Sequence, residues 1–152
     1  MISVKKLNTF LFLKLPSAFW CGVRVKEISN NHCVVSVKHR WINQNPFQSM
    51  YFAVQAMAAE LSTGALVIAK IKETGKPISM LVANNKGTFT KKATGRINFL
   101  CEDGHKLDEA IQNTLATGEG QTIWMKSIAT NEKGEQVSVM DFEWTIKAKN
   151  KK

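Results

Sequence analysis

The stretch NPFQSMYFAVQAMAAELSTG, from Asn45 to Gly64, is the longest apolar run in the chain, and a single carboxylate, Glu60, lies near its end. Its apolar residues recur at intervals of three and four, which is the spacing of a core-facing helix. This stripe consists of Phe47, Met50, Tyr51, Val54, Met57, Ala58 and Leu61. Asn45 suits a helix N-cap, Pro46 suits the first turn, and Gly64 suits the position after the last turn. We therefore predict a central helix over 46–63, and the segment LVIAKIK at 66–72 either continues this helix or begins a strand.

A second line of residues on this helix has small side chains and ends at the carboxylate. Ser49, Ala53, Ala56 and Glu60 follow one another at steps of four, three and four, so they share one face. Small side chains leave room for a facing backbone, a partner helix or an acyl chain, and Glu60 would stand at the end of that groove. A buried carboxylate is costly unless it is paired or protonated. Two interpretations stay open: a structural salt bridge or hydrogen bond, and a general base or nucleophile whose pKa is raised by burial.

The first amides of the predicted helix are a further chemical feature. The N–H groups around Phe47 to Ser49 have no partner within the helix and lie at the positive end of its dipole. Such amides can stabilise an oxyanion. Because every capped helix has this feature, it does not identify an active site by itself.

The rest of the chain predicts antiparallel strands around this helix. We expect a short helix at about 3–14 and an amphipathic helix at 104–118. Alternating patterns predict strands at 21–29, 32–40, 78–85, 88–102, 121–130 and 135–148. A turn is expected around 84–87. These elements predict an α+β fold in one domain over 1–152, with about six strands wrapped around the helix. One sheet covers only part of an apolar helix, so a second subunit related by twofold symmetry is expected.

Composition narrows the classes of function. The 152 residues carry a formal net charge of +9, which suits a polyanionic partner such as nucleic acid, anionic lipid head groups or coenzyme A. No ribonucleoprotein motif or recognition-helix pattern is present, so nucleic-acid binding is not expected. No run has the length and lack of charge of a membrane span, and the N-terminus does not match a signal peptide. These features predict a cytoplasmic protein.

The cysteines, histidines and glycines carry no motif for a metal or a cofactor. Cys21, Cys33 and Cys101 are far apart, which predicts free thiols in a reducing compartment. No zinc-ligand spacing, serine-hydrolase elbow or phosphate-binding glycine loop occurs in the sequence. We therefore expect neither a metal nor a cofactor.

The order of the elements resembles the hotdog fold, in which a curved antiparallel sheet wraps a long central helix. The resemblance rests on the N-P-x-x-S-M-Y-F segment before the helix, the small residues within it, the acidic residue of AAEL, and the last hairpin, NEKGEQVSVMDFEWTIKA. Over roughly Leu15 to Lys147 the chain is similar to a thioesterase-like family of unknown function. That family is related to acyl-CoA thioesterases of the phenylacetate-pathway type.

The resemblance implies roles for individual residues. Glu60 would activate water or attack a thioester carbonyl, and Asn45, about fifteen residues earlier, would orient the carbonyl or the water. An amide near Gln48 or Ser49 would stabilise the oxyanion at a dimer interface. Many related enzymes have a glycine at the start of the helix, and here Gln48 or Ala53 takes its place, depending on the alignment.

The function that the resemblance implies is hydrolysis of an acyl-CoA thioester by a homodimer or a dimer of dimers. Lys91, Lys92 and Arg96 are candidates for contacts with coenzyme A phosphates on charge alone, and solvent-facing strand positions are the alternative interpretation. The alternative function is a non-catalytic hotdog module that binds an acyl chain or acyl-CoA. An enzyme needs an open groove beside Glu60 with helix amides about 3 Å from the carbonyl oxygen. A binding module needs only the tunnel.

Overall fold

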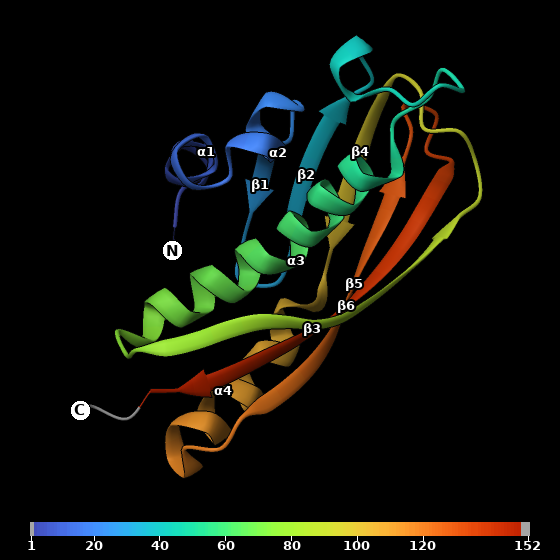
Figure 1. Ribbon diagram of the computed structural model, residues 1–152. Helices are drawn as coiled ribbons and strands as arrows, with labels where there is room; N and C mark the ends of the chain where they lie inside the picture. Colours follow the sequence, from blue (N-terminus) through green and yellow to red (C-terminus); the bar gives the residue numbers. More distant parts are fainter. Residues whose placement is uncertain (1, 150–152) are drawn as a thin grey trace.

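The computed structural model of the protein describes residues 2–149 (Figure 1). Its helices are α1 (Val4–Lys14), α2 (Pro16–Trp20), η1 (Trp41–Asn43), α3 (Phe52–Thr74), η2 (Asp103–His105) and α4 (Lys106–Thr117). Its strands are β1 (Arg24–Ile28), β2 (Cys33–Lys38), β3 (Ile78–Phe89), β4 (Arg96–Cys101), β5 (Gln121–Thr130) and β6 (Gln136–Ala148). Residue 1 and residues 150–152 of the expected domain lie outside the described residues.

The six strands form one antiparallel sheet in the order β1-β2-β4-β5-β6-β3. Burial alternates along β5 and β6, because every second side chain faces α3 and the others face away from it. The sheet curves around α3, which lies along its concave face, and α4 lies beside one end of β5 and β6 (Figure 1). This is the α+β hotdog arrangement that the resemblance implied, so the predicted fold class is confirmed.

α3 is the core helix of this arrangement. Ala58, Ala65 and Leu66 on α3 have no exposed surface. Among residues 2–149, α3 is the one helix long and apolar enough to cross a membrane by length and composition, and 67% of its apolar window is buried inside the fold. A core helix passes the same test, and burial beneath the sheet accounts for the apolar composition.

The central helix begins later than predicted, and it continues past Gly64, which is one of the two alternatives for residues 66–72. α3 has its N-cap at Tyr51 and its C-cap at Gly75, whose φ of 61° is the left-handed conformation that suits glycine. The residues before α3 form a turn closed by an isolated bridge between Gln44 and Met50. Because this bridge pairs Gln44 and Met50 as extended residues on either side of the turn, the helix cannot begin at Pro46.

Gly64 lies inside α3 and does not end it. A Cβ at this position would lie 3.0 Å from Cζ2 of Trp144 on β6, which is closer than ordinary side-chain packing permits. The indole therefore occupies the place of the missing side chain. A glycine in a helical pattern can mark a C-cap or a close approach, and only the tertiary contact tells the two apart.

The expected turn at 84–87 and the expected long strand at 88–102 are also wrong. β3 continues through 84–87 and ends at Phe89, and β4 begins at Arg96. Two strands, β5 and β6, separate β3 from β4 in the sheet, so the chain must leave the sheet between them. Ala93 in this connection is buried, because its carbonyl accepts from the Met50 amide at 2.8 Å, and its burial continued the apparent alternation.

The two edges of the sheet differ. β1 is covered by α1, whose predicted position at about 3–14 agrees with Val4–Lys14. The Asn8 side chain donates to the Val25 carbonyl at 2.9 Å and accepts from the Val25 amide at 3.0 Å, which satisfies part of that edge. Beyond β3, no described strand covers the opposite edge.

Candidate functional site

The Glu60 side chain is half-buried on α3. Among residues 2–149 its carboxylate has no hydrogen-bond or ion-pair partner, so the structural salt bridge or hydrogen bond, one of the two interpretations of Glu60, is not present there. Burial raises the pKa of Glu60 above its ordinary value. Its Oε1 lies 3.4 Å from where a Cβ on Gly64 would stand, and Cζ2 of Trp144 lies 3.0 Å from the same point.

The small residues predicted beside Glu60 lie on the same helix face only in part. Ala53 and Ala56 are half-buried on α3, on the side of the helix that the sheet leaves partly uncovered. Ser49 is buried in the turn that precedes the helix, because α3 begins only at Phe52. The predicted line of small residues on α3 is therefore reduced to Ala53 and Ala56, followed by Glu60.

Asn45 organises the turn before α3 and is not the helix N-cap. Its Oδ1 accepts from the Phe47 amide at 2.9 Å and from the Ser49 amide at 3.3 Å, and its Nδ2 donates to Ser49 Oγ at 3.0 Å. Asparagine favours such turns because its side chain can imitate a backbone carbonyl. The turn also places Gln48 at a φ of 58°, the one positive φ outside glycine among residues 2–149.

This turn engages the amides that were expected to hold an oxyanion. The Gln48 amide donates to the Asn45 carbonyl at 3.1 Å, and the Ser49 amide donates to the Asn45 side chain. Neither amide is available while the turn is formed. Within the described residues, the amides of Phe52 and Ala53 at the true start of α3 have no acceptor. Sequence reasoning missed Phe52 because it placed the helix start at Pro46.

A groove of about 420 Å³ lies beside the start of α3. It is lined by Asn45, Phe47, Ser49, Met50, Phe52, Gln55, Phe89, Thr90, Lys91, Lys92 and Ala93. The groove thus brings together Asn45, Ser49 and two of the predicted lysines. Glu60 does not line it, so the structure does not join the two predicted catalytic residues in one cavity.

The three basic candidates lie near the connection between β3 and β4, and each makes a polar contact. Lys91 pairs with Glu135 at 2.6 Å, Lys92 donates to the Phe47 carbonyl at 3.1 Å, and Arg96 donates to Ser36 Oγ at 3.4 Å. The pairing with Lys91 lowers the pKa of the exposed Glu135 carboxyl.

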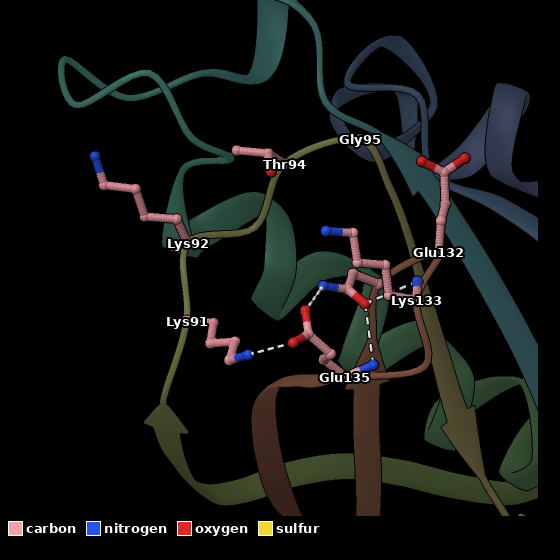
Figure 2. Close-up of a pocket in the computed structure, with 8 residues that line it drawn as sticks. Lys91, Lys92, Thr94, Gly95, Glu132, Lys133 and Glu135 are labelled. Carbon is pink, nitrogen blue, oxygen red and sulfur yellow. Dashed lines mark hydrogen bonds and ion pairs between the residues drawn. The ribbon is translucent and has the colours of Figure 1, made fainter.

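Lys91 and Lys92 also line a second pocket of about 420 Å³ (Figure 2). Lys133 lies in the same pocket, together with the carboxylates of Glu132 and Glu135. Lys91 points to Glu135, whereas Lys92 points away from the other side chains drawn (Figure 2). Arg96 lines neither this pocket nor the groove. The local positive charge is therefore partly neutralised.

Metal-ligating and nucleophilic residues do not gather elsewhere in the described chain. No group of three histidine, cysteine, aspartate or glutamate residues within residues 2–149 could hold a metal ion. Cys21, Cys33 and Cys101 are free thiols. Burial raises the pKa of Cys33 and of Cys101 to about 12, so neither is a ready nucleophile.

Solved structures with the same fold include proteins described as thioesterases. A protein of unknown function from Chlorobaculum tepidum has a TM-score of 0.84 at 17% identity, with 96% of this chain and 94% of that chain covered. A Pseudomonas aeruginosa protein described as "Probable Thioesterase" has a TM-score of 0.83 at 18% identity, with 98% and 99% covered. A thioesterase from Staphylococcus aureus has a TM-score of 0.65 at 18% identity, with 88% and 98% covered.

These similarities show that the chain shares the hotdog fold of these proteins. The chain belongs to the family of the domain of unknown function DUF4442, which matches residues 5–146. The predicted resemblance to a thioesterase-like family of unknown function is thereby confirmed. No curated protein sequence matches the chain.

Proposed function

We propose that the protein hydrolyses an acyl thioester, with acyl-CoA as the substrate class and Glu60 as the catalytic carboxylate. The observation that carries this proposal is the state of Glu60. It is a half-buried carboxylate on the central helix, without a partner among residues 2–149 and with a pKa raised by burial. A carboxylate held without a partner at an energetic cost is typical of a catalytic group.

Glu60 can act in two ways on a thioester. As a general base it removes a proton from a water molecule that attacks the carbonyl carbon, and as a nucleophile it attacks that carbon itself. A raised pKa serves the first role best, because a base is most effective when its pKa lies near the working pH. Either path develops negative charge on the carbonyl oxygen and releases the thiol.

The free amides of Phe52 and Ala53 are the donors that we assign to this oxygen. They lie at the positive end of the α3 dipole, which favours an oxyanion. Eight residues separate Phe52 from Glu60, which corresponds to about 12 Å along a helix axis. Because helix N–H groups point toward the start of the helix, a carbonyl oxygen bound by these amides would lie at that end of α3, and this distance separates it from the backbone of Glu60.

A structure with the same fold supports the choice of Asn45 and Glu60 as site residues. The Staphylococcus aureus thioesterase has been solved with a glutamine and, separately, with a glutamate replaced by alanine. Those two positions are as far apart in its chain as Asn45 and Glu60 are in this one. We infer a supporting role for Asn45 in shaping the turn that leads into α3.

We propose that the active unit is a homodimer formed through β3. This edge strand has twelve residues, and no described strand pairs with its outer side. Unpaired strand edges favour pairing with a second chain. Phe52 and Phe89, which are 6.3 Å apart between ring centroids, are both exposed beside this edge and would be covered in the dimer. The open face of α3 would then meet the partner subunit.

The groove beside the start of α3 is the site that we assign to the coenzyme A portion of the substrate. Lys92 is the cation best placed for a phosphate, since Lys91 is paired with Glu135 and Arg96 lies outside the groove. The groove does not reach Glu60, and this observation favours the second candidate function, a hotdog module that binds acyl-CoA without hydrolysing it.

Thioester hydrolysis by the purified protein separates the two functions. Short, long and aromatic acyl-CoAs would be supplied, and thiol release would be followed for the wild type and for Glu60→Gln. We expect turnover by the wild type and a loss of about 10²–10⁴-fold in Glu60→Gln, which is the range for a general base. Acyl-CoA binding without turnover by either protein would support the binding module.

A further inference from the structure

Gly64 leaves a bare patch on α3 that two side chains share. A Cβ built on Gly64 would lie 3.0 Å from Cζ2 and 3.1 Å from Cη2 of Trp144, and 3.4 Å from Oε1 of Glu60. The edge of the indole ring and the carboxylate therefore both lie close to the point where Gly64 lacks a side chain. Any larger residue at this position would have to displace one of them.

The indole is fixed in this place by its own contacts. Trp144 is 3% exposed and its Nε1 donates to Thr63 Oγ1 at 2.9 Å. Thr63 Oγ1 in turn donates to the backbone carbonyl of Glu60 at 2.9 Å. The ring is thus tied to the turn of α3 that carries the carboxylate. On the sheet, Trp144 is paired with Val82 of β3 and Ile123 of β5.

We propose that Trp144 is a positioning residue for Glu60: its six-membered ring seats the carboxylate against Gly64 and keeps water from its sheet-facing side. In this arrangement the carboxylate would be approached from the side of Ala53 and Ala56. The effect of Trp144 on catalysis rests on the proposed thioester hydrolysis. The placement of Trp144 next to Glu60 does not depend on that proposed function.

No described charged side chain on the neighbouring strands faces the Glu60 carboxylate. On the neighbouring strands β3, β5 and β6, the charged residues at this level are Lys86, Lys126, Asp141 and Glu143. Asp141 and Glu143 alternate with the buried Phe142 and Trp144, so they face away from α3, and Lys86 and Lys126 are paired with Asp141 on that same outer face. Burial is the cause of the raised pKa of Glu60, and both Trp144 and the Glu60 carboxylate lie close to the bare position of Gly64.

Fluorescence of Trp144 tests the contact without any substrate. The chain has four tryptophans, so replacing Trp20, Trp41 and Trp124 by Phe leaves Trp144 as the single emitter. We expect its emission to titrate with a midpoint above 4.5, the ordinary value for Glu60, because a protonated carboxyl quenches an adjacent indole. The step should vanish in the same protein carrying Glu60→Gln. A flat titration, or one that persists in Glu60→Gln, would overturn the proposal.

The pH dependence of kcat/KM tests the catalytic consequence. Trp144→Phe keeps an apolar ring but removes the donor and part of the ring edge, so water gains access to Glu60. We expect the acidic limb of the profile to move to lower pH, whereas Trp124→Phe, a 42% exposed position on the outer face, leaves it in place. An unchanged limb in a folded Trp144→Phe would contradict the positioning role.

Gly64→Ala provides a second variant that retains the indole. Its methyl group displaces the ring or the carboxylate, and we expect kcat to fall by about 10- to 100-fold with KM little changed. Wild-type kcat in Gly64→Ala would count against the proposal. If the wild type hydrolyses no acyl-CoA, the proposed function fails, and the single-tryptophan titration still decides whether Trp144 seats Glu60.

Discussion

The Glu60 carboxylate lies largely out of water without a partner among the described residues, so it should weaken the fold at neutral pH. Its pKa in the folded protein is raised, which means that the folded state holds the proton more tightly than the unfolded chain does. The stability linked to this group is therefore complete below the ordinary pKa of 4.5 and is lost as the pH rises through the raised value.

Glu60→Gln should consequently stabilise the protein at pH 7 while it lowers the proposed thioesterase activity. We expect a gain of about 0.5–2 kcal/mol at pH 7, the usual size of a stabilising substitution at a functional site, and a smaller gain at pH 4. Urea unfolding at both pH values measures it. Glu119→Gln, on an exposed loop, is the matched control and should change little. A loss of stability in Glu60→Gln at pH 7 would show that the carboxylate has a stabilising partner.

Asn45 should contribute to stability through the turn before α3. Asn45→Ala removes the acceptor for the Phe47 and Ser49 amides and the donor to Ser49, so we expect a loss of about 1–3 kcal/mol. Asn45→Asp retains the acceptor and should lose less. Chemical denaturation measures both variants. Equal losses in the two variants would indicate that the amide nitrogen, and not the acceptor oxygen, holds the turn.

The elements around these residues were predictable to different degrees. The long apolar pattern was sufficient for the existence of a central helix, but Asn45 and Pro46 carry the same signals in a turn as they do at a helix start. Gly64 indicated the end of the helix. Its missing side chain instead leaves room for the ring of Trp144, eighty residues away in sequence. Local signals could not show either fact, because each depends on a contact with a distant strand or bridge.

The residues of the candidate site also divide into those that local sequence patterns predict and those that depend on distant contacts. Glu60 and the small residues after Phe52 were visible in the sequence, since helical periodicity places them on one face. The oxyanion-binding role was assigned to an amide near Gln48 or Ser49, and not to those of Phe52 and Ala53, because the predicted start of the helix was too early. The partners of Lys91 and Arg96 were not predictable, because they lie on other strands or turns.

The contacts that tie α3 to the sheet make a further prediction. Ser138 donates to Oε1 of Gln55 at 2.9 Å, and both side chains are buried. Ser138→Ala would leave that oxygen without a donor, at a cost of about 1–3 kcal/mol. Ser127→Ala is a matched control that should cost less, because the Ser62 hydroxyl keeps the Ala59 carbonyl as an acceptor at 2.7 Å. Thermal unfolding of the two variants compares them, and the opposite ranking would contradict this expectation.

The whole molecule has one covered and one open sheet edge. α1 covers β1, which leaves β3 as the exposed edge for association. The sequence indicated a second subunit because one sheet does not enclose α3, but it did not indicate which edge would pair. Strand order depends on long-range pairing, which local patterns do not encode.

We expect a particle of about twice 17.0 kDa by light scattering after size-exclusion chromatography. Leu81 on β3 is 66% exposed, and Leu81→Lys should weaken the dimer, because an edge lysine opposes strand pairing. Ile128→Lys introduces the same charge on β5, inside the sheet, and should leave the dimer intact. A wild-type monomer at micromolar concentration, or equal effects of the two substitutions, would exclude dimerisation through β3.

The most direct test of the proposed function is the rate of thiol release from acyl-CoA by the purified protein, measured for the wild type and for folded Glu60→Gln between pH 5 and 8. We expect wild-type kcat/KM to rise along an acidic limb as Glu60 loses its proton. Glu60→Gln should bind acyl-CoA and hydrolyse it about 10²–10⁴-fold more slowly. Equal rates for the two proteins would remove Glu60 from the mechanism, and the absence of protein-dependent hydrolysis would contradict the assignment as a thioesterase.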